Sequence, residues 1–206
     1  PDRYPVLLES VGGDEPLGRH DVLLALPGEQ LVQRPEGRLE GHVADPELPF
    51  LRALDHWFLE ERTPPNGRRP FAGGWFLYLG YELAAEIEPS LHLPPPRHAR
   101  AIAWRMRGAI VRDHVTGEVN VLAERGAADA LRQQYESDLS AAPAGVATLE
   151  RLLDGTVDEE PPERFLRGVD AVLEAIGRGD VYQANLSRGW RATLASGVSA
   201  ADLYRR

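Results

Sequence analysis

The sequence has 206 residues and a formal net charge of −9, with 43% hydrophobic and 27% charged residues. This composition is that of an ordinary globular protein, long enough for one large domain or two small ones. The negative charge argues against nucleic acid or an anionic membrane surface as a partner, because both attract basic proteins. No apolar run approaches the roughly 20 residues that a membrane helix needs, so we expect a cytoplasmic protein without membrane association.

Two residue types are missing, and their absence limits the chemistry of the chain. Without cysteine there is no disulfide and no thiolate nucleophile or metal ligand. All 23 basic residues are arginine, so no lysine is present for Schiff-base chemistry or for a phosphate-binding loop. The six histidines lack the spacing of metal sites, and no serine lies in a Gly-x-Ser-x-Gly turn. We therefore predict no metal site and no catalytic residue in this chain.

The first part of the chain is predicted to contain short strands followed by a helix. Val6–Leu8 is typical of a strand, and Asp21–Leu26 of a second one. Pro27–Gly28 indicates a turn, so we expect Gln30–Gln33 to pair back as a hairpin. Residues 45–62 change to helical spacing of their apolar side chains, which predicts a helix.

The middle of the chain is predicted to be mostly strand. Pro70–Leu83 indicates an apolar strand bounded by glycines, whose aromatic residues we interpret as core: Trp75, Tyr78 and Tyr81. Ala101–Arg112 alternates in polarity, as a half-buried strand does, with Arg105 and Arg107 on the polar face. A hairpin should join it to Glu118–Ala123, and a helix is expected over residues 127–140.

The last part is predicted to be a helix and a strand after a linker. Residues 141–161 are small, acidic and contain proline, which is typical of a surface linker. Pro162–Arg178 has one apolar stripe, and Gly179 suits the left-handed turn that ends a helix. A strand should follow from Val181 to Trp190, and its polar face would meet water if it lay at a sheet edge.

Three segments resemble the chorismate-utilising synthases. They are Leu-Leu-Glu-Ser at 7–10, the glycine-bounded strand at 70–83, and Gly-Asp-Val-Tyr-Gln-Ala-Asn-Leu-Ser-Arg-Gly-Trp at 179–190. One branch of this family makes 4-amino-4-deoxychorismate for para-aminobenzoate and folate synthesis, and another makes anthranilate. Asn185 within Tyr-Gln-Ala-Asn-Leu favours the first branch.

The resemblance implies a fold, an organisation and an activity. The fold would be α+β, antiparallel and strand-rich, with orthogonally packed sheets and flanking helices. Residues 1–140 would form the N-terminal region, 141–161 a linker, and 162–206 the start of the chorismate-binding region. The enzyme would aminate chorismate with ammonia from a glutamine amidotransferase subunit. Its Mg²⁺ ligands and its lysine would lie outside this chain, so the chain alone should not catalyse the reaction.

The same resemblance implies site residues. Leu8, Glu9 and Ser10 would line a tryptophan-type pocket, since a carboxylate and a hydroxyl can bind the polar end of an amino acid. Tyr182 and Asn185 would be binding contacts. Two other functions stay open: the anthranilate synthase large subunit, and a stand-alone small-molecule-binding module of the same fold. For Glu9 and Ser10, the polar end of a strand is the alternative interpretation.

Overall fold

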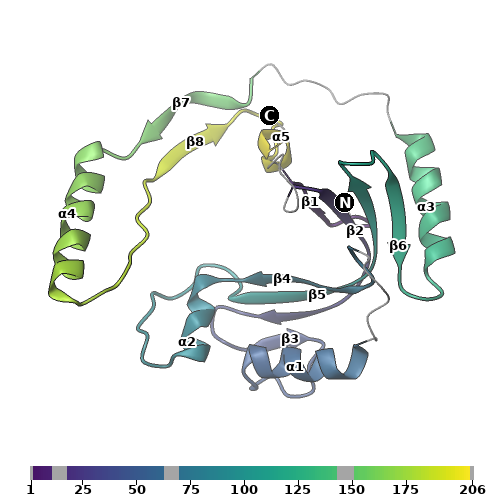
Figure 1. Cartoon of the computed structure of the whole chain (residues 1–206), viewed down its shortest axis with the longest axis horizontal. Coiled ribbons are helices and arrows are strands. Elements are labelled where there is room, and N and C mark those ends of the chain that lie inside the picture. Colours follow the sequence, from purple (N-terminus) through teal and green to yellow (C-terminus); the bar gives the residue numbers. More distant parts are fainter. Residues whose placement is uncertain (1, 11–17, 63–69, 143–150, 205–206) are drawn as a thin grey trace. The chain divides into compact units, whose positions relative to one another are not determined.

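The computed structural model describes residues 2–10, 18–62, 70–142 and 151–204. The chain forms two compact units, one ending at Ala142 and the other beginning at Pro143. Each unit has an antiparallel sheet and at least one flanking helix, which confirms the expected α+β class (Figure 1).

The sheet of the first unit has six strands. Their order is β1-β2-β5-β4, with β3 pairing with β2 and β6 pairing with β5. Figure 1 shows α1 against one face of this sheet and α3 beside β6. The strands are β1 Val6–Leu8, β2 His20–Gln33, β3 Leu39–Gly41, β4 Gly74–Leu79, β5 Ala101–Asp113 and β6 Val119–Ala123. The helices are α1 Phe50–Glu61, α2 Ala84–Ile87, preceded by a 3₁₀ turn Tyr81–Leu83, and α3 Ala128–Ala141.

Strand β2 is a single long strand, so the hairpin expected at Pro27–Gly28 was wrong. The segments on both sides of this dipeptide pair with β5, and the register shifts between Pro27 and Gln30. Leu26 has a left-handed φ of 52°, which marks the distortion. Proline and glycine are tolerated at such a bulge, because the ladder of hydrogen bonds is interrupted there anyway. The pairing of both halves with a 13-residue partner outweighed the local turn signal.

The core of the first unit has two clusters, one for each half of β2. Leu31 belongs to the cluster under α1, where Phe50 and Trp57 are buried. Leu24 belongs to the second cluster, together with Met106, Ala109 and Val111 of β5. Helix α1 thus covers one half of the long strand pair, and Leu131 of α3 is buried against Gly108 in the other half.

Strand β5 lies in the middle of the sheet and is buried on both faces, so the half-buried interpretation was wrong. Arg105 is only 3% exposed, whereas Arg107 is exposed as expected. The alternating pattern predicted a solvent-exposed Arg105, but Glu61 and Glu124 pair with this arginine and make its burial possible. The prediction of core aromatics is confirmed for Trp75, which packs on the α1 cluster. It was wrong for Tyr78 and Tyr81, which are 46% and 86% exposed.

The second unit contains β7 Leu153–Glu159, α4 Pro162–Arg178, β8 Trp190–Leu194 and α5 Ala200–Tyr204. The predicted helix is confirmed, and Gly179 ends it with a φ of 78°. Residues 153–159 of the expected linker form a strand that pairs with β8, and residues 143–150 lie outside the described part of the chain.

The strand expected from Val181 to Trp190 begins only at its last residue. Glu159 of β7 pairs with Trp190, and Glu160 N donates to the Gly189 carbonyl at 3.0 Å. Before that point residues 181–189 have no ladder in the described structure. An alternating sequence does not make a strand by itself, because a strand exists only where another strand pairs with it.

Candidate functional site

Ser10 is tied to the beginning of β2. Its backbone N–H donates to Asp21 Oδ1 at 2.9 Å, and its hydroxyl donates to the His20 carbonyl at 2.8 Å. Leu8 is 48% exposed, and Glu9 is exposed as well. Of the three residues expected in a tryptophan-type pocket, Ser10 is thus held by hydrogen bonds, whereas the side chains of Leu8 and Glu9 are open to solvent. Their role in binding stays a prediction.

The carboxylate of Asp21 joins Ser10 to the turn after β5. His114 Nε2 lies 2.9 Å from Asp21 Oδ2, while Oδ1 accepts from Ser10. Burial raises the pKa of Asp21, but the hydrogen bonds from His114 and Ser10 outweigh it, so the net pKa lies below the ordinary value. Asp21 is therefore ionised at neutral pH and can hold both partners.

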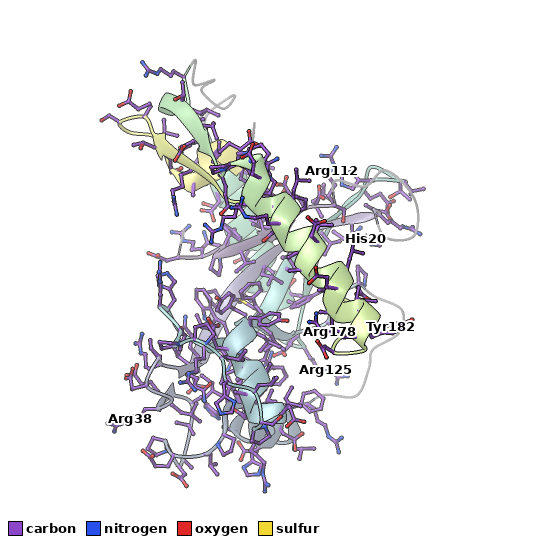
Figure 2. All side chains as sticks on the ribbon, turned by 90° about the vertical axis from the view of Figure 1, so that its left-hand side faces the viewer. His20, Arg38, Arg112, Arg125, Arg178 and Tyr182 are labelled. Atoms are coloured by element: carbon purple, nitrogen blue, oxygen red, sulfur yellow. The ribbon has the colours of Figure 1, made fainter. Side chains whose placement is uncertain are left out.

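Asp113 forms a second acid–imidazole pair at the same end of the sheet. Arg19 donates to its Oδ2 through Nε at 2.9 Å and Nη2 at 2.8 Å, and His20 Nε2 lies 3.6 Å from the same oxygen. Its other oxygen accepts from Val115 N and Thr116 N. The hydrogen bond from Arg19 and the turn amides lower the pKa of Asp113 to about 2. Figure 2 labels His20 and Arg112, which lie on the paired strands β2 and β5.

Tyr182 and Asn185 lie in the extended segment that follows α4. Figure 2 labels Tyr182 together with Arg178 at the C-terminal end of this helix. Tyr182 is 96% exposed and Asn185 is exposed, so both are open to a ligand. They belong to the second unit, whereas Leu8, Glu9 and Ser10 belong to the first. As binding contacts, these two residues also stay a prediction.

A buried ionic cluster around Arg105 was missed by the sequence analysis. Arg105 Nε donates to Glu61 Oε2 at 2.7 Å, and its Nη2 pairs with Glu124. Its guanidinium lies over the Trp75 ring, 4.5 Å from the centroid, and Trp57 Nε1 donates to Glu61 at 2.8 Å. Burial lowers the pKa of Arg105, but these carboxylates raise it more, so the arginine stays charged. The cluster joins α1, β4, β5 and the end of β6, and its role is structural.

Signals for these clusters are present in the sequence, although they are weak. Arg105 interrupts the apolar run between Trp104 and Met106, and a charge within such a run indicates a buried partner. Asp21 stands directly before the apolar residues of β2. His114 carries no such signal, because its partner is 93 positions away and only the sheet register brings the two together.

A hollow of about 690 Å³ lies between α1 and the segment after β3. His42 stacks on Trp57 in it, with 4.4 Å between ring centroids, and His42 Nδ1 lies 3.4 Å from Glu29 Oε2. Glu60 adds a second carboxylate to the lining. The two carboxylates give the hollow negative charge, and the imidazoles of His42 and His56 line it beside them.

Two kinds of feature are absent from the described ranges. There, no group of three or more His, Asp or Glu side chains is arranged to hold a metal ion. No helix within those ranges combines the length and the apolar character needed to cross a membrane.

Comparison with solved structures supports the fold. Anthranilate synthase component I from Streptococcus pneumoniae TIGR4 matches with a TM-score of 0.64 and 20% identity, covering 98% of this chain and 46% of that chain. The described units therefore have the architecture found in part of that larger structure.

Curated relatives and a family model agree with this result. Anthranilate synthase component 1 of Cereibacter sphaeroides is 29% identical over 89% of this chain and 42% of its own length. A 2-amino-4-deoxychorismate synthase of Streptomyces globisporus is 28% identical over 90% of this chain and 38% of its own length. This chain thus spans less than half the length of either relative. Residues 19–206 match the family model described as chorismate binding enzyme, and the chain belongs to that family.

Proposed function

We propose that this chain is the N-terminal portion of a synthase that converts chorismate and ammonia to 4-amino-4-deoxychorismate. The observation that carries the proposal is the family match over residues 19–206, in a chain that covers 42% and 38% of two synthases. The segment Tyr182–Leu186 favours this product over anthranilate, because Asn185 within it resembles the sequence pattern of the 4-amino-4-deoxychorismate branch.

In this proposal the chain supports a reaction centre formed by other residues. It has no lysine to act as a nucleophile. Among its described residues, no cluster of three or more acidic or histidine side chains is arranged to hold a Mg²⁺ ion. No step through Mg²⁺ is therefore assigned to these residues. The acidic hollow near Glu29 and Glu60 would repel chorismate, whose carboxylates are negatively charged. Chorismate would therefore bind outside this hollow, and the Mg²⁺ ligands would lie outside the described residues.

The second unit shows features of a part that packs against further protein. Helix α4 has an apolar stripe, yet none of its residues is buried. Leu166 and Leu173 are 59% and 61% exposed. A helix with such a stripe is stable when the stripe is covered, because helices gain most of their stability from packing. Nothing within the described residues of the second unit buries this stripe, which supports packing of α4 against protein outside that unit.

For the first unit we propose an amino-acid site at Leu8, Glu9 and Ser10. Exposed Leu8 offers an apolar contact to an aromatic side chain, and Glu9 offers a carboxylate to an ammonium group. Tryptophan is the proposed ligand, from the resemblance of this segment to the feedback pocket of the family. A glutamine amidotransferase subunit is the proposed source of ammonia.

Anthranilate synthase is the second candidate. The relative from Cereibacter sphaeroides, which bears that name, favours it with 29% identity over 89% of this chain.

Product analysis distinguishes the two candidates. The complete polypeptide containing this chain would be incubated with chorismate, ammonium and Mg²⁺, and the products separated and identified by mass. We expect 4-amino-4-deoxychorismate. The fluorescence of anthranilate in the product would overturn the assignment and support the second candidate.

A further inference from the structure

We propose that Asp21 and His114 are positioning residues for an amino-acid ligand at Leu8, Glu9 and Ser10. Asp21 contacts Ser10, and His114 contacts Asp21, so neither residue touches the ligand. Together they hold the backbone at Ser10 in place, next to the residues that would contact the ligand. This inference rests on the amino-acid site proposed above. It adds two residues that the sequence resemblance did not point to.

The geometry of the Asp21 carboxylate carries the inference. One oxygen accepts from Ser10 N at 2.9 Å, and the other lies 2.9 Å from His114 Nε2. Both bonds are charge-assisted, and such bonds are about twice as strong as neutral ones. Because the two oxygens belong to one planar group, the imidazole sets the rotation of the carboxylate that Ser10 meets. The side chain of Asp21 is 17% exposed, which limits competition from water.

His114 is itself held in place, so it can orient Asp21. Its backbone N–H donates to the Arg19 carbonyl at 2.8 Å. Asp113 accepts from the two amides that follow His114, which fixes the turn. The imidazole therefore extends from a rigid turn between β5 and β6 toward the start of β2. Three strands, β1, β2 and β5, meet at Ser10 through this chain of contacts.

Other charged groups surround the pair, and they favour an ionised Asp21. Arg112 lies opposite Asp21 in the strand register and lowers its pKa. Arg19 and His20 interact with Asp113 rather than with Asp21. Loss of His114 therefore removes the orientation of the carboxylate while leaving its charge.

The test measures tryptophan affinity by titration calorimetry on the complete polypeptide. The variants are Asp21→Ala, His114→Ala and His114→Gln, because a glutamine amide can replace the Nε2 donor. We expect about tenfold weaker binding for the two alanine variants, the size of one lost bond to a charged group. His114→Gln should recover to within about threefold of the unchanged protein, which a merely structural role would not produce.

His42→Ala is the matched control. It removes another imidazole from an acid pair and from its stack on Trp57, so it lowers the melting temperature without contact to Ser10. Its tryptophan affinity should stay unchanged. Equal affinity of Asp21→Ala and the unchanged protein would overturn the positioning role and leave the amino-acid site standing. No tryptophan binding by the unchanged protein would overturn the site and the positioning role together.

Discussion

Arg105, in the middle of the central strand β5, is paired with Glu61 at the end of α1, with 2.7 Å between Nε and Oε2. This pair attaches the helix to the sheet at a point where the strand is buried on both faces. The guanidinium also donates to the carbonyls of Gly74 and Met106 at 3.0 Å, so its donors are used within the unit. The positive charge of Arg105 is tolerated in the interior because the carboxylates of Glu61 and Glu124 neutralise it.

Replacement of Arg105 by methionine should lower the free energy of unfolding by about 3 kcal/mol, because it leaves two carboxylates beside an apolar side chain. Urea unfolding followed by circular dichroism measures the change. Arg107→Met is the control, since Arg107 is exposed two residues further along the same strand. It should change stability by about 0.5 kcal/mol or less. Equal losses for both variants would contradict the role of the cluster.

Gly41 and Gly117 both have a left-handed backbone, with φ of 90° and 73°, but they differ in surroundings. A Cβ at Gly41 would lie 1.9 Å from the Gln30 carbonyl oxygen, whereas nothing lies within 4 Å of one at Gly117. Gly117→Ala should cost about 1–2 kcal/mol for the backbone conformation alone. Gly41→Ala should cost clearly more, since backbone must move. Thermal unfolding of both variants compares them, and equal melting temperatures would refute the difference.

Asp113 should contribute to the acid stability of the first unit. Its pKa is lowered from 3.8 to about 2 by the hydrogen bond from Arg19 and by turn amides. A lowered folded-state pKa means that the contribution is complete above the unfolded value near 3.8 and is lost as pH falls toward 2. The stability difference between the unchanged protein and Asp113→Asn should therefore shrink between pH 4 and pH 2.

Urea titrations at several pH values across this interval measure that difference. A difference that stays constant down to pH 2, or that grows as the pH falls, would show that the carboxylate is not stabilised by Arg19.

Asn185 should matter for activity and not for folding, because it is exposed in the segment after α4. In the complete polypeptide we expect Asn185→Ala to lower kcat/KM for chorismate about tenfold, the size of one lost hydrogen bond in a site. The melting temperature should not change. Glu174→Ala, on the exposed surface of α4, is the control and should leave kcat/KM unchanged. Equal kinetics for the two variants would remove Asn185 from the site.

Local signals in the sequence were sufficient for helix α4, whereas the 3₁₀ turn Tyr81–Leu83 was wrongly predicted as the end of a strand. Proline at the start of α4, glycine at its end and one apolar stripe between them define this helix without help from distant residues. Helix α1 begins at Phe50 rather than near residue 45, since Pro46 and Pro49 restrict the backbone before it. These features act within one or two turns, so they are visible in the sequence.

The errors concern contacts between distant segments. The Pro27–Gly28 dipeptide has the local chemistry of a turn, and only its pairing with β5 shows that it is a bulge. Arg105 alternates like a surface residue, and only Glu61 and Glu124 make its burial possible. Ser10 was predicted as a site residue from its sequence motif. Asp21 and His114 were not, because only the pairing of the strands brings them close to Ser10. Partners far apart in the sequence are not specified by local pattern.

Chorismate consumption tests most directly whether this chain is a supporting part of a chorismate-utilising synthase. The 206-residue chain and the complete polypeptide that contains it would be compared with chorismate, ammonium and Mg²⁺ under the same conditions. We predict that the complete polypeptide consumes chorismate and that the chain alone does not. Turnover of chorismate by the chain alone, or its absence with the complete polypeptide, would contradict the account.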